Sequence, residues 1–134
     1  MYLLDTDVCI HLLNNADARL RQEFRRRSPS DIALCSVVKA ELLFGAYHST
    51  RVDANLQRLK VFFRPLRSLP FDDQCIEHYA LIRTDLAAQG KPIGPNDLLI
   101  AAIARANDVT LVTRNTKEFG RVSGLAIEDW QKPQ

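Results

Sequence analysis

The chain has 134 residues, of which 46% are hydrophobic and 25% charged, and its net charge is +2. This composition is typical of one globular domain and argues against a disordered or membrane protein. No apolar stretch reaches the ~20 residues that a membrane helix requires. The apolar amino terminus carries acids and lacks a basic leading region, so we expect no secretion signal. Because the three cysteines are widely spaced, we expect a protein of the reducing cytoplasm.

Short apolar runs alternate with amphipathic segments along the chain, a pattern typical of buried strands alternating with helices. The predicted strands are Tyr2–Leu4, Ile32–Cys35, Leu66–Leu69, Val109–Thr113 and Leu125–Ile127. The predicted helices are Asp7–Asn14, Asp17–Arg27, one that follows Ser36, Asp53–Phe63, one from Asp72 that stops at Gly90, Asp97–Ala106, and a turn at Thr116–Phe119. This order predicts an α/β fold: a three-layer α/β/α sandwich around a mainly parallel sheet of four or five strands, in a single domain spanning residues 1–134.

Local signals predict how three of these helices begin and how one of them packs. Polar residues at the helix starts predict N-caps at Thr6, Ser36 and Asn96. In the helix after Ser36, residues spaced three and four apart predict the face that packs on the core. That face consists of Val37, Ala40, Leu43 and Phe44.

Three carboxylates stand where folding would gather them. Asp5 ends the first strand, Glu41 lies among apolar residues of a helix, and Asp97 opens an apolar helix. Parallel sheets bind ligands beyond the carboxyl ends of their strands, and clustered acids protonate one another unless a cation lies between them. Carboxylate oxygens suit Mg²⁺ or Mn²⁺, so the pattern predicts a metal-dependent nuclease.

Each acid also has a structural explanation. Asp97, like Asp7, is well placed as a first-turn acid that stabilises the start of a helix. The alternative for Glu41 is a salt bridge to a nearby arginine or to Lys39, which is less favoured because long acids are seldom deeply buried.

Four motifs in register resemble those of PIN-domain ribonucleases, and most closely the VapC toxins of prokaryotic toxin–antitoxin pairs. They are Tyr2–Ile10, Ser36–Ala46, Ile93–Ala102 and Thr110–Phe119. The resemblance implies that Asp5 and Asp97 are the main ligands of Mg²⁺ or Mn²⁺ and that Glu41 is the third acid. Many family members have an aspartate where this chain has Asn115, which implies weaker binding of a second metal. It also implies that Thr6 and Thr113 are orienting hydroxyls; the role of Asp7 stays open.

The same resemblance implies a biological role. It implies that single-stranded or loop RNA, often transfer RNA, is cleaved by metal-activated water to leave a 3′-hydroxyl and a 5′-phosphate. It further implies a homodimer that a VapB-like antitoxin inhibits. The aromatic residues of two predicted helices are either core or a surface for such a partner; they are Phe44, Tyr47, Phe62 and Phe63.

Two other functions fit parts of the sequence. A phosphatase of the haloacid dehalogenase type would use Asp5 as its nucleophile and Asp72 with Asp73 as its metal pair. A metal-free module that binds RNA or protein is favoured by the loss of a carboxylate at Asn115.

The remaining features have mainly structural interpretations. The basic second helix is either a solvated face or an RNA contact; its arginines are Arg19, Arg21, Arg25, Arg26 and Arg27. The histidines and cysteines lack zinc-site spacing. We expect Trp130 to pack the tail onto the core.

Overall fold

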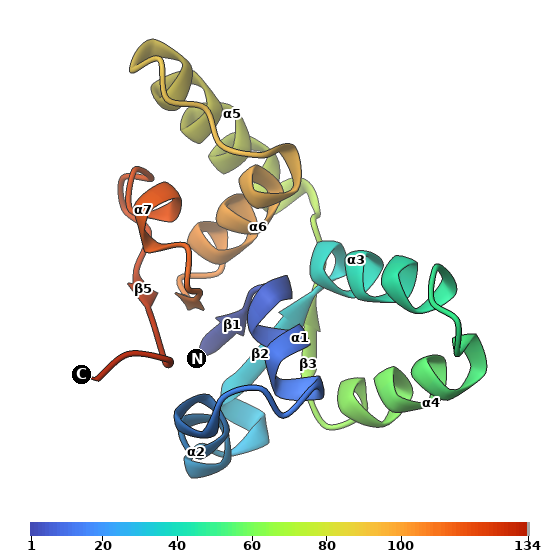
Figure 1. The fold of residues 1–134 in the computed structure, drawn as a ribbon. Helices are drawn as coiled ribbons and strands as arrows, with labels where there is room; N and C mark the ends of the chain where they lie inside the picture. The colour runs from blue at the N-terminus through green and yellow to red at the C-terminus, as the bar shows by residue number, and fades with distance from the viewer. Residues whose placement is uncertain (134) are drawn as a thin grey trace.

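The computed structural model describes residues 1–133, and within them five strands form one sheet in the order β3-β2-β1-β4-β5 (Figure 1). The strands are β1 (Tyr2–Leu4), β2 (Ile32–Cys35), β3 (Arg67–Leu69), β4 (Thr110–Val112) and β5 (Ile127–Glu128). Every pairing between neighbouring strands is parallel, which confirms the predicted parallel sheet. The last strand lies later than predicted, because the Leu125 N–H bonds to the Val122 carbonyl in a turn at Gly124, whose φ is 77°.

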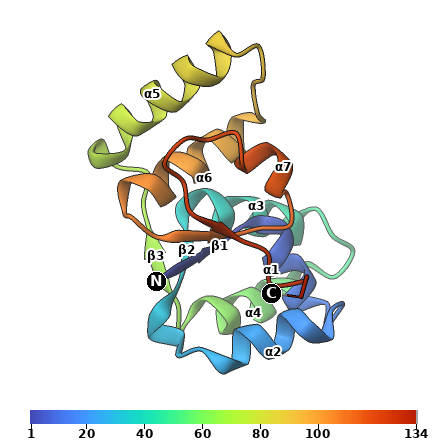
Figure 2. The same ribbon diagram turned by 90° about the vertical axis from the view of Figure 1, so that its left-hand side faces the viewer.

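Helices cover both faces of this sheet. They are α1 (Thr6–Leu13), α2 (Ala18–Arg26), α3 (Ser36–Tyr47), α4 (Val52–Phe63), α5 (Asp73–Ala88), α6 (Pro95–Ala106) and α7 (Thr116–Phe119), with a 3₁₀ turn at Pro29–Asp31. In Figure 2, α5 and α6 lie above the sheet, and α2 and α4 lie below it. The predicted three-layer α/β/α sandwich is therefore confirmed.

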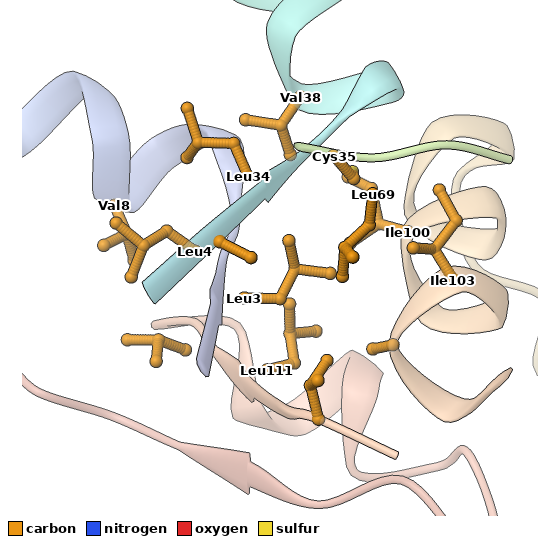
Figure 3. Close-up of a cluster of buried hydrophobic side chains, with 14 of the residues drawn as sticks. Leu3, Leu4, Val8, Leu34, Cys35, Val38, Leu69, Ile100, Ile103 and Leu111 are labelled. Carbon is orange, nitrogen blue, oxygen red and sulfur yellow. The ribbon is translucent and has the colours of Figure 1, made fainter. Parts of the chain in front are cut away.

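The strands themselves form the centre of the core. Figure 3 shows Val8 of α1 on one side of the strands and Ile100 with Ile103 of α6 on the other. Leu3 and Leu4 of β1 are both fully buried, as expected for a parallel strand that is covered on both faces. Each such leucine contributes on the order of 2 kcal/mol through removal of its side chain from water. This burial fixes the end of β1, and therefore the position of Asp5.

The predicted helix caps are wrong by one or two residues. Asp5 rather than Thr6 caps α1, and Cys35 precedes α3 without a side-chain cap. Gly94 precedes α6, and Pro95 occupies the first turn, where its missing N–H costs nothing. Both Thr6 and Asn96 therefore lie inside helices, so their side chains are available for bonds elsewhere.

The predicted core face of α3 is also wrong. The buried residues of this helix are Val38, Leu42 and Ala46, whereas Phe44 is 68% exposed and Ala40 is exposed. Both stripes obey helical spacing, because α3 is apolar on nearly every side, so periodicity alone cannot choose between them. The consequence is an aromatic surface on the outer side of α3.

Trp130 anchors the carboxyl-terminal segment, as the sequence predicted. It is 1% exposed, and its ring meets that of Tyr2 edge-on with 5.2 Å between centroids. The Arg27 guanidinium lies 4.2 Å from the Trp130 ring centroid and 4.8 Å from that of Tyr2. It also forms a 2.7 Å ion pair with Glu23. Arg27 therefore holds the tail against β1 and is not a free phosphate-binding group.

We predict that Trp130→Ala lowers the free energy of unfolding by about 3–5 kcal/mol, the usual cost of truncating a buried large aromatic side chain. Urea denaturation followed by circular dichroism measures it. Trp130→Phe, the matched control, keeps an apolar ring and should lose less than half as much. A loss below about 1 kcal/mol for the alanine variant would contradict the anchoring role.

Candidate active site

Asp5 and Thr113 stand side by side at the carboxyl ends of β1 and β4. The register pairs Leu4 with Val112, and the Asp5 N–H continues the ladder with a 3.0 Å bond to the Val112 carbonyl. The Thr113 hydroxyl, fully buried, donates a 2.5 Å hydrogen bond to Asp5 Oδ2. Strand order reverses at β1, and such switch points are where open α/β sheets bind ligands.

The other oxygen of Asp5 is fixed by the helix that follows it. Asp5 Oδ1 accepts the backbone N–H groups of Asp7 at 2.9 Å and Val8 at 3.3 Å. Burial raises the pKa of Asp5, and the Thr113 and backbone bonds oppose that rise. Since Asp5 is only 7% exposed, these bonds replace the water that an ionised carboxylate would otherwise need. Asp5 therefore has one orientation, with its charge aimed at the crevice.

Glu41 approaches the same crevice from α3. Its carboxylate is half-buried and accepts hydrogen bonds from Thr6 Oγ1 at 2.6 Å and from Asn96 Nδ2 at 3.2 Å. Among residues 1–133 it forms no ion pair, so the alternative of a salt bridge is not found; Lys39 lies instead over the Phe63 ring, 5.0 Å from its centroid. Asn96, which sequence reasoning treated only as a cap, is thus a site residue, and Glu41 links α1, α3 and α6.

Asp97 lies in the first turn of α6 and responds to the charge of the whole cluster. Burial raises its pKa to about 6, together with the negative charges of Asp5, Glu118, Glu41 and Asp7, in decreasing order. Carboxylates influence one another appreciably only at short range or in low dielectric. The charges of Asp5 and Glu41 therefore act on Asp97, although burial is the largest cause of its raised pKa.

Glu118 is a fourth acid of this cluster, and sequence reasoning missed it. Asn115 caps α7, with its Oδ1 accepting the Glu118 N–H at 3.4 Å, while its Nδ2 donates to Glu118 Oε2 at 2.5 Å. The Asn115 N–H in turn donates to Thr113 Oγ1 at 3.0 Å. An N-cap followed three residues later by a glutamate is a capping signature. That spacing could have identified Glu118, which places a carboxylate beside the amide at Asn115.

Asp7 separates two open clefts at the surface of the cluster. One cleft, of about 430 Å³, is lined by Asp5, Asp7, His11, Arg114 and Asn115. The other, of about 790 Å³, contains Thr6 and Glu41 with Asn96 and a further apolar wall. Asp7 itself is exposed. The clefts give a chain-like ligand access to the acids from two directions.

The donor set suits a hard divalent cation and excludes a thiolate site. The charged groups that raise the pKa of Asp97 are all carboxylates, and Mg²⁺ or Mn²⁺ prefers oxygen ligands. Cys9, Cys35 and Cys75 are buried free thiols, and burial raises the pKa of Cys35 to about 11, so it stays protonated. Within residues 1–133 no three acid, histidine or cysteine side chains already form a chelating group. The acids would have to exchange hydrogen bonds for metal bonds.

We predict that the apo protein loses stability as the pH rises from about 4 to 6, because Asp97 holds its proton more tightly when folded than when unfolded. The folded state then binds more protons in this window, so the free energy of unfolding falls with pH. Asp97→Asn should reduce this slope by the part that Asp97 contributes, and should stabilise the protein at pH 7 by about 1 kcal/mol, a value reduced for the half-exposed position.

Denaturation in EDTA across this pH range measures the effect. The matched control is Asp73→Asn, which neutralises an exposed acid in the first turn of α5. An unchanged slope in Asp97→Asn would contradict the predicted coupling of the acids.

Comparison with known proteins places this geometry in a family. A tRNA(fMet)-specific endonuclease VapC from Shigella flexneri is 38% identical over 129 residues, covering 96% of this chain and 97% of the relative. Ribonuclease VapC2 from Rickettsia felis is 38% identical over 133 residues, covering 98% and 99% of the two chains. A crystal structure of VapBC2 from Rickettsia felis, bound to a promoter DNA fragment, contains a chain that superposes with a TM-score of 0.90 at 36% identity, covering 96% of this chain and 98% of that one.

The model of the PIN-domain family matches residues 2–125, a range that includes every acid of the cluster. The matched relatives share the length of this chain almost completely. The chain therefore belongs to the PIN-domain family and, within it, to the VapC ribonucleases.

Proposed function

We propose that the protein is a toxin that cleaves single-stranded or loop RNA with the help of Mg²⁺ or Mn²⁺. The observation that supports this most is the position of Asp97, whose pKa is raised to about 6 by burial and by the negative charges of Asp5, Glu118 and Glu41. A divalent cation relieves such repulsion between carboxylates. The proposed nuclease domain spans residues 1–134.

In this proposal Asp5 and Asp97 hold the cation, and Glu41 ligates it or positions a water. A bound divalent cation polarises the phosphoryl oxygen and makes water a stronger nucleophile at neutral pH. The chain's own contribution is orientation. Thr113 and two backbone N–H groups fix Asp5, while Thr6 and Asn96 fix Glu41; such supporting bonds are typically worth 10–100-fold in metal affinity or activity.

The proposed substrate is transfer RNA, cut to leave a 3′-hydroxyl and a 5′-phosphate. The support is the 38% identical Shigella flexneri relative, which is named as specific for tRNA(fMet). The phosphatase alternative has no such support. Asp72, one half of its required metal pair, uses its carboxylate to cap α5 at Gln74, and β3, which precedes it, lies two strands away from β1.

We further propose a VapB-like antitoxin as partner, on the strength of the similarity to a VapBC2 complex. An apolar cleft of about 230 Å³ lies between α1, α3 and α4, and its lining residues include Ile10, Leu42 and Leu59 as well as Glu41. A groove of this kind accepts the apolar face of a helix.

The aromatic surface of α3 supports a homodimer. Phe44 is 68% exposed and Tyr47 is 65% exposed. Two large aromatic side chains exposed on one helix are typical of a protein–protein contact surface. Phe62 and Phe63, in contrast, pack against the core. No helix within residues 1–133 is long and apolar enough to cross a membrane, and we propose that the protein acts in the cytoplasm.

We predict that Asp5→Asn and Asp97→Asn each lower the rate of RNA cleavage by at least about 100-fold. Loss of a residue that only orients a metal ligand typically costs less, about 10- to 100-fold. Each variant should also weaken Mn²⁺ binding, because an amide replaces a charged ligand. Gel analysis of labelled tRNA and isothermal titration with Mn²⁺ measure the two effects.

The matched control is Asp53→Asn, which neutralises an exposed first-turn acid of α4 and should leave both quantities unchanged. Full activity in Asp5→Asn would refute the assignment. Absence of Mn²⁺ binding by the wild-type protein would instead favour the metal-free binding module.

We predict that Glu118→Gln weakens Mn²⁺ binding about 10-fold, because the carboxylate that adds negative charge at Asp97 is lost. It should also lower the pKa of Asp97, which nuclear magnetic resonance of the carboxyl carbon in EDTA can follow. Glu77→Gln, on the exposed side of α5, is the control. If Glu118→Gln changes neither quantity, Glu118 serves only to cap α7.

A further inference from the structure

The cleft that contains Asp5 does not end at the acids. It meets a second cleft, of about 360 Å³, at His11 and Arg114, since these two residues line both. Beyond them the second cleft is lined by Ala16, Asp17, Asp129, Gln131 and Lys132. The two clefts together form a path that leads from the acid cluster toward the carboxyl-terminal segment.

Arg114 is available to a ligand on this path. It follows Thr113 directly, its side chain is exposed, and it forms no hydrogen bond or ion pair with residues 1–133. Two other arginines are engaged: Arg27 pairs with Glu23, and Arg105 donates to the Ser123 carbonyl at 3.0 Å. The Arg114 guanidinium is exposed and forms no ion pair with the nearby acids, so it can bind an anion of a ligand. The planar arrangement of its N–H donors fits phosphate especially well.

His11 offers a second donor at the junction of the clefts. The Gln131 amide nitrogen lies 3.0 Å from His11 Nδ1 and 3.3 Å from Asp17 Oδ2. Asp17 requires a donor from Gln131, which fixes the amide orientation, and the same nitrogen then donates to His11 Nδ1. Neutral His11 therefore carries its proton on Nε2, where it can be donated to an oxygen of a ligand.

The acids of the second cleft are already bonded to the chain. Asp17 accepts the Leu20 N–H at 2.9 Å as the cap of α2, and Asp129 accepts the Gln131 N–H at 2.8 Å. Lys132 is exposed and also lines this cleft. The two clefts therefore carry Arg114, His11 and Lys132, and each acid of the second cleft accepts a backbone N–H group.

Building on the proposed RNA cleavage, we propose that Arg114, His11 and Lys132 form a subsite for the RNA backbone phosphates next to the one that is cut. A polyanion whose scissile phosphate lies at the acids needs cations at the neighbouring phosphates to offset their repulsion. These cations line the two joined clefts, so the strand is expected to run from the acids along this path. Arg114 and His11 are positioning residues for the nearest phosphate, and Lys132 serves the next one.

The test compares Arg114→Ala and Lys132→Ala with Arg64→Ala and Lys117→Ala, which remove the same charges from exposed positions outside the path. Binding of a fluorescein-labelled single-stranded RNA is measured in EDTA at several salt concentrations. Loss of one phosphate contact should reduce the slope of log K against log salt by about 0.7. With Mn²⁺ present, KM should rise about 3- to 10-fold, while kcat changes little because the acids are intact.

The outcomes separate this proposal from the one on which it rests. If the wild-type protein with Mn²⁺ does not cleave RNA, the proposed function itself fails. If it cleaves RNA but Arg114→Ala matches Arg64→Ala in salt slope and KM, the subsite is refuted while the nuclease stands. Weaker binding of a VapB-like antitoxin by Arg114→Ala, with RNA binding unchanged, would also overturn the proposal, because the path would then serve a protein.

Discussion

The hydrogen bond from Thr113 Oγ1 to Asp5 Oδ2, at 2.5 Å, is the contact on which the rest of the site depends. It joins the ends of two strands that are 108 residues apart in sequence, and it exists only because β1 and β4 pair in parallel with Leu4 opposite Val112. One register shift would turn every side chain to the other face. The apolar core that buries β1 on both faces therefore determines where the first carboxylate points.

Further hydrogen bonds connect this contact to the other acids of the site. Thr113 also accepts the Asn115 N–H, and Asn115 bonds the side chain of Glu118, so one threonine connects two acids. On the opposite side Glu41 is held by Thr6 and Asn96. The pKa of Asp97 is raised by burial and by the charges of the other acids. Asp5, Glu41 and Glu118 are thus oriented by neutral donors instead of by lysine or arginine, and in the proposed function a cation would relieve the repulsion between the acids.

Sequence reasoning predicted the parts of this arrangement that rest on local signals. A strand that ends in Asp5 and a helix that opens with Asp97 can be identified from apolar runs and their boundaries, and the parallel sheet then brings both to one edge. The buried face of α3 could not be chosen, because Val37 and Val38 begin two apolar stripes of equal quality. The role of Asn96 depends on its bond to Glu41 of a helix distant in sequence, which no local spacing encodes. Glu118 carries a local signal in its capping spacing from Asn115, but its influence on Asp97 of another helix does not follow from that spacing.

Asn115 is a position at which the site departs from the family pattern described above. Considered alone, the substitution removes a negative charge and favours weaker binding of a second metal ion, or no second ion. In the fold, its amide donates to Glu118 Oε2, so a carboxylate is present one side chain further along α7. Because electrostatic effects depend on where charge lies and not on which residue carries it, Glu118 still contributes negative charge at Asp97. Asp5, Glu41 and Glu118 are each held by hydrogen-bond donors, whereas burial and the surrounding negative charges raise the pKa of Asp97. This arrangement destabilises the apo protein at neutral pH, and a divalent cation would relieve the repulsion between the acids.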